Sequence, residues 1–142
     1  ETIVSQYTTR RDKLFSNKEV LPEFASLEVV KAVQSIAGNP VGFETWFDAL
    51  DWMKTEIEKK DFDIALLGCG AYAMPLAAHI KRMGKKAVHM GGVLQFLFGI
   101  KSVRYEENPA TAQYINEYFV YPNEADKPKN ANLVEGGCYW GR

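Results

Sequence analysis

Glycines follow two short apolar runs in the middle of the chain. The run IALL (residues 64–67) precedes GCGAY, and the run AVHM (residues 87–90) precedes two more glycines. Because glycine lets backbone N–H groups approach a ligand and a helix N-terminus favours negative charge, we expect a phosphate, pyrophosphate or carboxylate to bind here. The alternative, that the glycines only make tight turns, stays open. The predicted ligand-binding residues are Gly68, Cys69, Gly70, Ala71 and Tyr72, called the first glycine loop, and Gly91 and Gly92, called the second glycine loop.

The first glycine loop also begins the dinucleotide-binding pattern G-x-G-x-x-A, with Ala73 in the last position. That pattern needs an acidic residue about 20 positions further on, where it holds a ribose hydroxyl. His89 and Met90 occupy that place, and no acidic residue lies between Asp63 and Glu106. We therefore rank a nicotinamide cofactor or S-adenosylmethionine below other anionic ligands.

His89, Glu117 and Glu135 are the candidates for a catalytic role, and the sequence alone assigns the chemistry to none of them. His89 ends a predicted strand just before the second glycine loop, where it could donate to a phosphate or transfer a proton near neutral pH. Cys69 lies between two glycines near a predicted helix N-terminus, a setting that lowers the pKa of a thiol. No nucleophilic triad can be read from the sequence.

Asp61 and Asp63 have the D-x-D spacing that holds a divalent metal in many sugar-nucleotide transferases. A metal-binding D-x-D follows a strand, whereas this one precedes the run at residues 64–67. We therefore predict a solvated turn at the edge opposite the glycine loops, and no metal site. The two cysteines and two histidines have no zinc-binding spacing.

The C-terminal residues VEGGCYWG (134–141) combine glycines with aromatic side chains. Aromatic rings stack on sugars and bases, and glycine leaves room for such a ligand. This segment is predicted either to line a sugar or base pocket or to form a strand end packed on the core.

The periodicity of apolar residues predicts alternating strands and helices. Helices are expected at residues 1–15, 43–60, 74–83, 93–98 and 109–119, strands at 27–36, 64–67 and 87–90, and a loop at 121–132. The clearest helix carries an apolar stripe, widened by Phe47 and Ala49, that we expect to face the core; its members are Phe43, Trp46, Leu50, Met53 and Ile57. This order predicts an α/β fold, a Rossmann-like three-layer sandwich with a mostly parallel sheet.

Size and composition limit the classes of protein that fit. The 142 residues are 46% hydrophobic and carry a formal charge of −1, which suits one folded domain and lacks the basic surplus of a nucleic-acid-binding protein. No apolar run approaches the roughly 20 residues of a membrane span. We expect a cytoplasmic protein in a reducing compartment, and residues 1–142 as a single Rossmann-like domain. Because the chain opens at Glu1 with a helix, we expect an N-terminal portion of a longer chain to be missing.

Four segments of the chain resemble the GT-D-like family, glycosyltransferase-fold proteins found in many bacterial surface-polysaccharide loci. They are DIALLGCGAYAMPLAAHIKRMGKKAVHMGG (63–92), LQFLFGI (94–100), NEY (116–118) and EGGCYW (135–140). The resemblance runs from about residue 34 to residue 140. It implies a Rossmann-like domain related to enzymes that transfer a sugar from a nucleotide donor to a growing glycan.

The resemblance implies a sugar-nucleotide-binding domain of a glycosyltransferase-like protein in polysaccharide biosynthesis. Two alternatives stay open: a non-catalytic binding or assembly module of the same fold, and a nucleotide-dependent enzyme that uses the G-x-G-x-x-A loop. The family's acidic D-x-E motif and its F-G-D-G-E stretch are both missing from this sequence. A divalent metal would therefore be bound through a segment absent from this chain, or the metal-dependent transfer chemistry is lacking. The oligomeric state is not predicted.

Overall fold

The computed structural model describes residues 1–141, apart from the side chain of Ala37. The chain divides into two compact units. Unit 1 comprises Glu1–Phe24, Ile36–Asn39 and Gln95–Arg142, and unit 2 comprises Ala25–Ser35 and Pro40–Leu94. Whether residues 1–142 act as one domain stays a prediction.

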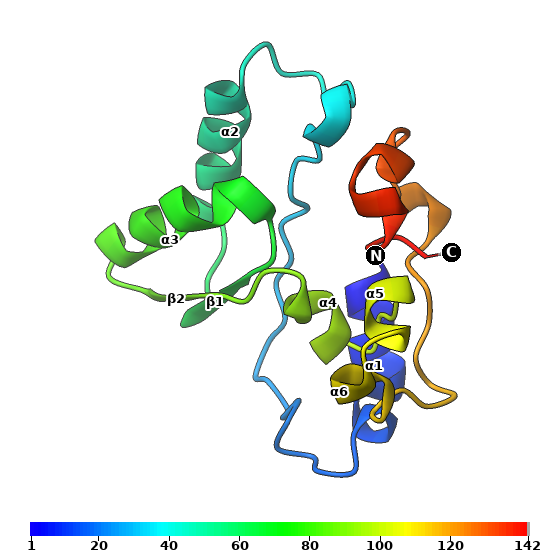
Figure 1. Cartoon of the computed structure of the whole chain (residues 1–142). Coiled ribbons are helices and arrows are strands. Elements are labelled where there is room, and N and C mark those ends of the chain that lie inside the picture. Colours follow the sequence, from blue (N-terminus) through cyan, green and yellow to red (C-terminus); the bar gives the residue numbers. More distant parts are fainter. Residues whose placement is uncertain (142) are drawn as a thin grey trace. The chain divides into compact units, whose positions relative to one another are not determined.

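Unit 2 contains a parallel sheet of two strands, β1 (Ile64–Leu67) and β2 (Lys86–His89). Ile64 pairs with Lys86 and Leu67 with His89, so the strands lie in register along their whole length. Helix α3 (Ala73–Arg82) connects them and packs on both (Figure 1). The predicted strand–helix–strand order with parallel pairing is confirmed, and the two glycine loops consequently follow neighbouring strands at one edge of the sheet.

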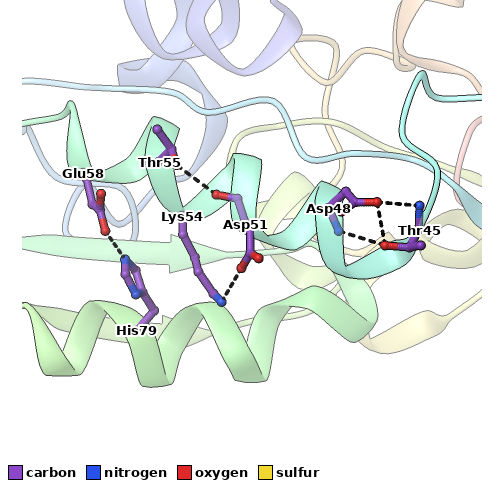
Figure 2. Close-up of polar contacts among 7 residues, drawn as sticks. All are labelled: Thr45, Asp48, Asp51, Lys54, Thr55, Glu58 and His79. Carbon is purple, nitrogen blue, oxygen red and sulfur yellow. Dashed lines mark hydrogen bonds and ion pairs between the residues drawn. The ribbon is translucent and has the colours of Figure 1, made fainter.

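Helix α2 (Trp46–Glu58) precedes β1 and begins with a capping box. The hydroxyl of Thr45 accepts a hydrogen bond from Asp48 N–H at 3.1 Å, and the Asp48 carboxylate accepts one from Thr45 N–H at 2.9 Å (Figure 2). This pairing satisfies N–H groups that the first helical turn leaves free. The pattern Thr45-x-x-Asp48 is a helix-start signal that can be read from the sequence.

The apolar stripe of α2 forms the core of unit 2, as predicted. Leu50, Met53 and Ile57 are buried against Leu76 and Ile80 of α3. Phe47 does not join them, because its side chain is 69% exposed, so the prediction that it widens the core stripe is wrong. The reason is angular: Phe47 is one residue, or about 100°, away from Trp46 around the helix, beyond the face that meets α3.

Helices α2 and α3 run in the same direction. At the start of α2 the Trp46 ring stacks on Tyr72, just before α3, with centroids 4.7 Å apart. Near the ends of both helices Glu58 Oε1 lies 3.0 Å from His79 Nε2 (Figure 2). Because α2 leads into the amino end of β1, its first turn lies at the carboxyl edge of the strands, as does the start of α3.

The strand predicted at residues 27–36 is absent, since residues 26–35 form no regular element. Three side chains of this segment, Val30, Ala32 and Val33, pack on the core of unit 2. These apolar side chains are therefore partly buried, like those of a strand, but the backbone of the segment does not pair with the sheet. Unit 2 is mixed α/β, and a three-layer sandwich is not confirmed.

Unit 1 is built around helix α1 (Thr2–Leu14), which confirms the predicted first helix. Gln6 is 3% exposed, and its side-chain amide donates to the carbonyls of Gly99 and Tyr118, both at 3.0 Å. Leu14 is buried at the end of α1, and the rings of Phe15, Phe96, Tyr105 and Phe119 pack in edge-on or tilted contacts.

The chain also contains three short α-helices: α4 (Val93–Leu97), α5 (Val103–Glu106) and α6 (Pro109–Ala112). The helix predicted over residues 109–119 is therefore confirmed only in its first turn. Beyond it, the Asn116 side-chain amide donates to the carbonyls of Lys13 and Leu14 at 3.1 Å, and so caps the end of α1. The C-terminal segment forms a 3-10 turn, η5 (Glu135–Gly137), and no strand end. None of the described helices is long and apolar enough to cross a membrane.

Candidate functional site

The two glycine loops touch each other at the carboxyl edge of β1 and β2. The carbonyl of Leu67, the last residue of β1, accepts hydrogen bonds from Met90 N–H at 2.8 Å and Gly91 N–H at 3.2 Å. A Cβ placed on Gly68 would lie 2.9 Å from the Gly91 carbonyl oxygen. Gly68 therefore lacks a side chain because the second loop occupies that space, and its role is packing.

Gly70 has the opposite surroundings. It is exposed, no atom lies within 4 Å of the position its Cβ would take, and its φ of +56° is a conformation that glycine adopts readily. Gly70 turns the chain into a short 3-10 helix, η2 (Gly70–Tyr72), which leads directly into α3. The open space in front of Gly70 is thus available to a ligand.

The N–H groups at the start of this helical segment are the polar groups that the site offers. Tyr72 N–H donates to the Cys69 carbonyl and Ala73 N–H donates to the Gly70 carbonyl. Within the described part of the chain, the N–H groups of Gly70 and Ala71 form no hydrogen bond. Both residues are exposed, so these two donors can bind an anion at the helix start.

Tyr72 supports the loop from the core. It is 5% exposed, its ring stacks on Trp46, and its hydroxyl lies 3.0 Å from the Ser35 hydroxyl. Ala73, the last position of the G-x-G-x-x-A pattern and the first residue of α3, is completely buried in the core of unit 2, which fits close packing of a helix start on a strand. Only the backbone of Tyr72 remains for contact with a ligand.

The expectation of a lowered thiol pKa at Cys69 is wrong. Burial of Cys69 raises the pKa of its thiol, and a hydrogen bond to its own backbone offsets only part of that effect. Removal of the sulfur from water disfavours the thiolate more than the nearby helix start favours it. Cys69 is therefore a protonated, partly buried side chain at neutral pH.

His89 lies on the exposed surface at the end of β2. Its Nδ1 is 3.3 Å from both the N–H of Gly91 and the carbonyl oxygen of Leu67. With Nδ1 unprotonated the ring accepts from Gly91, and with Nδ1 protonated it donates to Leu67. Either contact fixes the ring beside the second glycine loop, while Nε2 is not used in these contacts.

The other catalytic candidates lie in unit 1. Glu117 is exposed in the turn before Phe119. Glu135 has φ +46°, and its carboxylate accepts a hydrogen bond from the Tyr139 hydroxyl at 3.1 Å. His89 belongs to unit 2, so the three catalytic candidates are divided between the two units.

Glu135 lines a cavity of about 460 Å³ in unit 1. A pocket at the C-terminal segment is one of the two predictions made for residues 134–141. The lining of the cavity is Val103, Glu106, Glu107, Glu135, Gly136, Cys138 and Gly141. Burial raises the pKa of the nearby Tyr139 hydroxyl, as does its hydrogen bond to Glu135, whereas Arg104 lowers it. No sequence motif marked Glu106 and Glu107, because α5 brings them to the cavity only after folding.

Asp61 and Asp63 precede β1 and so lie at the edge opposite the glycine loops. The Asp61 carboxylate is exposed and lies 3.4 Å from Lys85 Nζ, and the Asp63 carbonyl accepts from Lys86 N–H. Among the described residues, no three His, Cys, Asp or Glu side chains come together as a metal site.

Two large apolar residues at the helix starts of unit 2 are exposed, and no sequence pattern marks them as surface residues. Phe47 and Met74, each the second residue of its helix, are both 69% exposed. Helical periodicity assigned Phe47 to the core and gave no signal for Met74. Only the exposed fraction of each side chain in the folded structure distinguishes these two residues from core residues.

The fold and the loops define unit 2 as a parallel β-α-β unit with glycine-rich turns at the carboxyl ends of its strands, an arrangement typical of α/β proteins that bind anionic ligands. A family model described as the GT-D fold-like domain matches residues 12–97. The chain belongs to the GT-D-like family. The match includes both glycine loops but ends before residues 116–118 and 135–140, which had suggested the same family. No curated protein and no solved structure matches the chain.

Proposed function

We propose that unit 2 binds the diphosphate group of a sugar nucleotide at the two glycine loops, as the binding domain of a glycosyltransferase-like protein in polysaccharide biosynthesis. The observation that carries this proposal is the pair of exposed N–H groups of Gly70 and Ala71, which form no hydrogen bond within the described residues. Family membership supports a glycosyltransferase-like fold. The proposal concerns binding, and His89 beside the second glycine loop stays a candidate for a catalytic role.

Magnitudes favour an anion over a neutral ligand at these donors. A hydrogen bond to a charged group contributes about 1.5–3 kcal/mol, and the helix dipole adds about 0.3–1 kcal/mol for a negative charge near its N-terminus. Two such bonds correspond to roughly a hundredfold or more in affinity. His89, at the neighbouring loop, supplies a side chain that donates when protonated.

The alternatives make different demands on the same loops. A dinucleotide-dependent enzyme needs an acidic residue at the end of β2, where the chain has His89. A non-catalytic assembly module of this fold would bind the same ligand without turning it over. Calorimetric titration with uridine and guanosine diphosphates, their glucose conjugates, nicotinamide adenine dinucleotide and S-adenosylmethionine separates a sugar-nucleotide-binding domain from a dinucleotide-dependent enzyme. Consumption of the bound glucose conjugate, followed over time, separates an enzyme from an assembly module.

A pair of substitutions at Gly70 tests the place of binding. Gly70→Asp and Gly70→Asn both put a short side chain into open space, and both residues tolerate a positive φ. They differ in one negative charge, so Gly70→Asp should weaken diphosphate binding at least about tenfold relative to Gly70→Asn. Circular dichroism spectra of both variants are the control that each variant is folded. Equal affinities in the two variants, or no diphosphate binding by the wild-type chain, would contradict the proposed function.

A further inference from the structure

The sheet of unit 2 has an open edge along β2. In a parallel pair of strands, the N–H and C=O groups of every second residue point to the partner strand. Lys86 N–H donates to the Asp63 carbonyl at 3.2 Å, and Met90 N–H donates to the last carbonyl of β1 at 2.8 Å, so the even-numbered residues of this stretch face β1. The N–H and C=O groups of Ala87 and His89 therefore point to the opposite edge. No described residue forms a backbone hydrogen bond with them there.

Strand β2 is also the more exposed strand of the pair. Three of its four residues are exposed and Ala87 is half-buried, whereas Ile64 is the one exposed residue of β1. A strand edge with unused donors and acceptors is a template for one more extended segment. Peptides that bind in this way obtain affinity from main-chain hydrogen bonds and specificity from alternate side chains.

The two faces of the strands offer such a segment different surroundings. Ala65, Leu67 and Ala87 lie on the face that packs with α2 and α3 in the core of unit 2. Because side chains alternate along a strand, Lys86 and Val88 stand on the other face, and Val88 is 45% exposed. On that face an added strand has one side chain beside Lys86 and another, two positions along, beside Val88.

The charges near this edge favour an acidic segment. No Asp or Glu occurs between residues 64 and 105. Lys81 and Arg82 end α3, and the turn that follows, in which Gly84 N–H donates to the Lys81 carbonyl at 3.0 Å, keeps them near the start of β2. Lys81, Arg82 and Lys86 are exposed and form no ion pair with any residue that the structure describes.

Two carboxylates lie at the same end of the sheet. Asp61 is 3.4 Å from Lys85 Nζ, so its charge is offset. Asp63, which precedes β1, is exposed and is the remaining negative charge against the three exposed cations. The start of β2 is therefore positively charged, and a segment that pairs with it gains from negative side chains.

We propose that the edge of β2 binds an extended acidic segment of another protein, which joins the sheet as a third strand. The backbone groups of Ala87 and His89 pair with the segment, an acidic side chain of the segment lies beside Lys86, and an apolar one lies beside Val88. Alternating donors and acceptors select a peptide over a nucleic acid, and a second copy would bring the same cations against this edge. The inference does not depend on the proposed function, which concerns the loops at the ends of the strands.

The test uses the peptide EVTETVE, titrated into the full chain labelled for heteronuclear NMR. Its valines and central glutamate stand on one face whichever direction the peptide takes. The amide signals of Ala87 and His89 should shift, and hydrogen exchange of these two amides should slow at least about fivefold at saturation. The lysine counterpart KVTKTVK should bind at least about tenfold more weakly at low salt. The peptide EVPEPVE, in which prolines remove two backbone donors, should also bind at least about fivefold more weakly.

Substitutions in β2 test the same contact from the side of the protein. Ala87→Pro removes an N–H that points away from β1, a position where a strand tolerates proline, so the pairing with β1 is kept. The affinity for EVTETVE should fall at least about fivefold in Ala87→Pro, whereas Ala87→Ser, the matched control that keeps the N–H, should stay within about twofold. Lys86→Glu should weaken binding at least about fivefold at low salt and less at high salt. Urea unfolding is the control that each variant is folded.

Four outcomes would overturn the proposal. They are no binding of EVTETVE at about 1 mM, equal affinities of Ala87→Pro and Ala87→Ser, equal affinities of the acidic and lysine peptides, and shifts confined to Gly70 and Ala71, which would place the peptide at the first glycine loop. Binding of oligouridylate as tight as that of EVTETVE and unaffected by Ala87→Pro would assign the cations to a nucleic acid instead. Self-association of the wild-type chain in sedimentation, lost in Ala87→Pro, would assign the edge to a second copy.

Discussion

The ring of Trp46 lies flat on the ring of Tyr72, with centroids 4.7 Å apart and planes inclined by 6°. This contact joins the first residue of α2 to the last residue of the first glycine loop. It sets the direction of α2 relative to α3, and it supports the loop from the buried side. The exposed side of the same loop keeps the unpaired N–H groups of Gly70 and Ala71 that the proposed function uses.

The hydroxyl of Tyr72 contributes to stability through Ser35. Tyr72→Phe keeps the stacking on Trp46 but removes the 3.0 Å hydrogen bond to the Ser35 hydroxyl. The free energy of unfolding in urea should fall by about 0.5–1.5 kcal/mol. Ser35→Ala should have a similar effect, and the double variant should be little worse than either single one. Strictly additive losses would show that the two hydroxyls act independently.

Gly68 and Gly70 should respond differently to a methyl group. Gly68→Ala places a Cβ 2.9 Å from the Gly91 carbonyl oxygen and from Leu94, so it should force the loops apart and destabilise unit 2 by about 1–3 kcal/mol. Gly70→Ala meets no atom within 4 Å, and its cost is the left-handed conformation, about 1–2 kcal/mol.

Heteronuclear NMR distinguishes the two glycine substitutions. Gly68→Ala should shift the amide signals of the second glycine loop, whereas Gly70→Ala should leave them in place. Unchanged second-loop signals in Gly68→Ala would contradict the packing role given to Gly68.

Cys69 should be an unreactive thiol in the folded protein. Burial raises its pKa, so in a Cys138→Ser background the alkylation of Cys69 by iodoacetamide at about pH 8 should be several-fold slower in the folded chain than in urea. Equal rates would contradict a raised pKa.

The same shift predicts the sign of a pH dependence. Above the ordinary pKa of a thiol the folded state retains a proton that the unfolded state has lost, so stability falls as the pH rises from that ordinary value through the raised one. In the Cys138→Ser background, the loss of stability between about pH 7 and about pH 10 should therefore be larger than in a Cys69→Ala, Cys138→Ser variant. Parallel pH profiles for these two proteins would contradict the sign.

The acidic pair before β1 should not take part in ligand binding. Asp61→Asn combined with Asp63→Asn changes side chains at the edge opposite the glycine loops, where Asp61 faces Lys85. The affinity for uridine diphosphate, with and without added magnesium, should stay within about twofold of wild type. A lost magnesium dependence in the double variant would make the D-x-D pair a metal site after all.

Local patterns predicted the regular elements of unit 2 well. The uninterrupted run at residues 64–67 is β1, and the strand predicted at 87–90 is found one residue earlier, as β2. The apolar stripe containing Leu50, Met53 and Ile57 is the buried face of α2. These predictions hold because a short apolar run and a repeat of three or four residues report on which faces are covered. Parallel pairing follows from them, since a helix between two strands favours a crossover connection.

The same patterns failed where a contact with a distant part of the chain decides the conformation. The segment at residues 26–35 has the composition of a strand, and Val30 and Val33 pack on the core without joining the sheet. The helix predicted to extend to residue 119 ends at Ala112, and Asn116 instead caps the end of α1. A hydrogen bond across more than a hundred residues leaves no signal in a local window.

The sequence by itself determined that glycines follow two short apolar runs with a helix between them, because residue type and order are sufficient for that conclusion. Only the tertiary structure decided what each glycine does. Gly68 has the second loop against it and Gly70 has open space, a difference set by which strand lies beside β1. It also decided that Tyr72 is buried and Phe47 exposed, because exposure depends on the neighbours that a side chain meets once α2 and α3 pack together, and not on its own hydrophobicity.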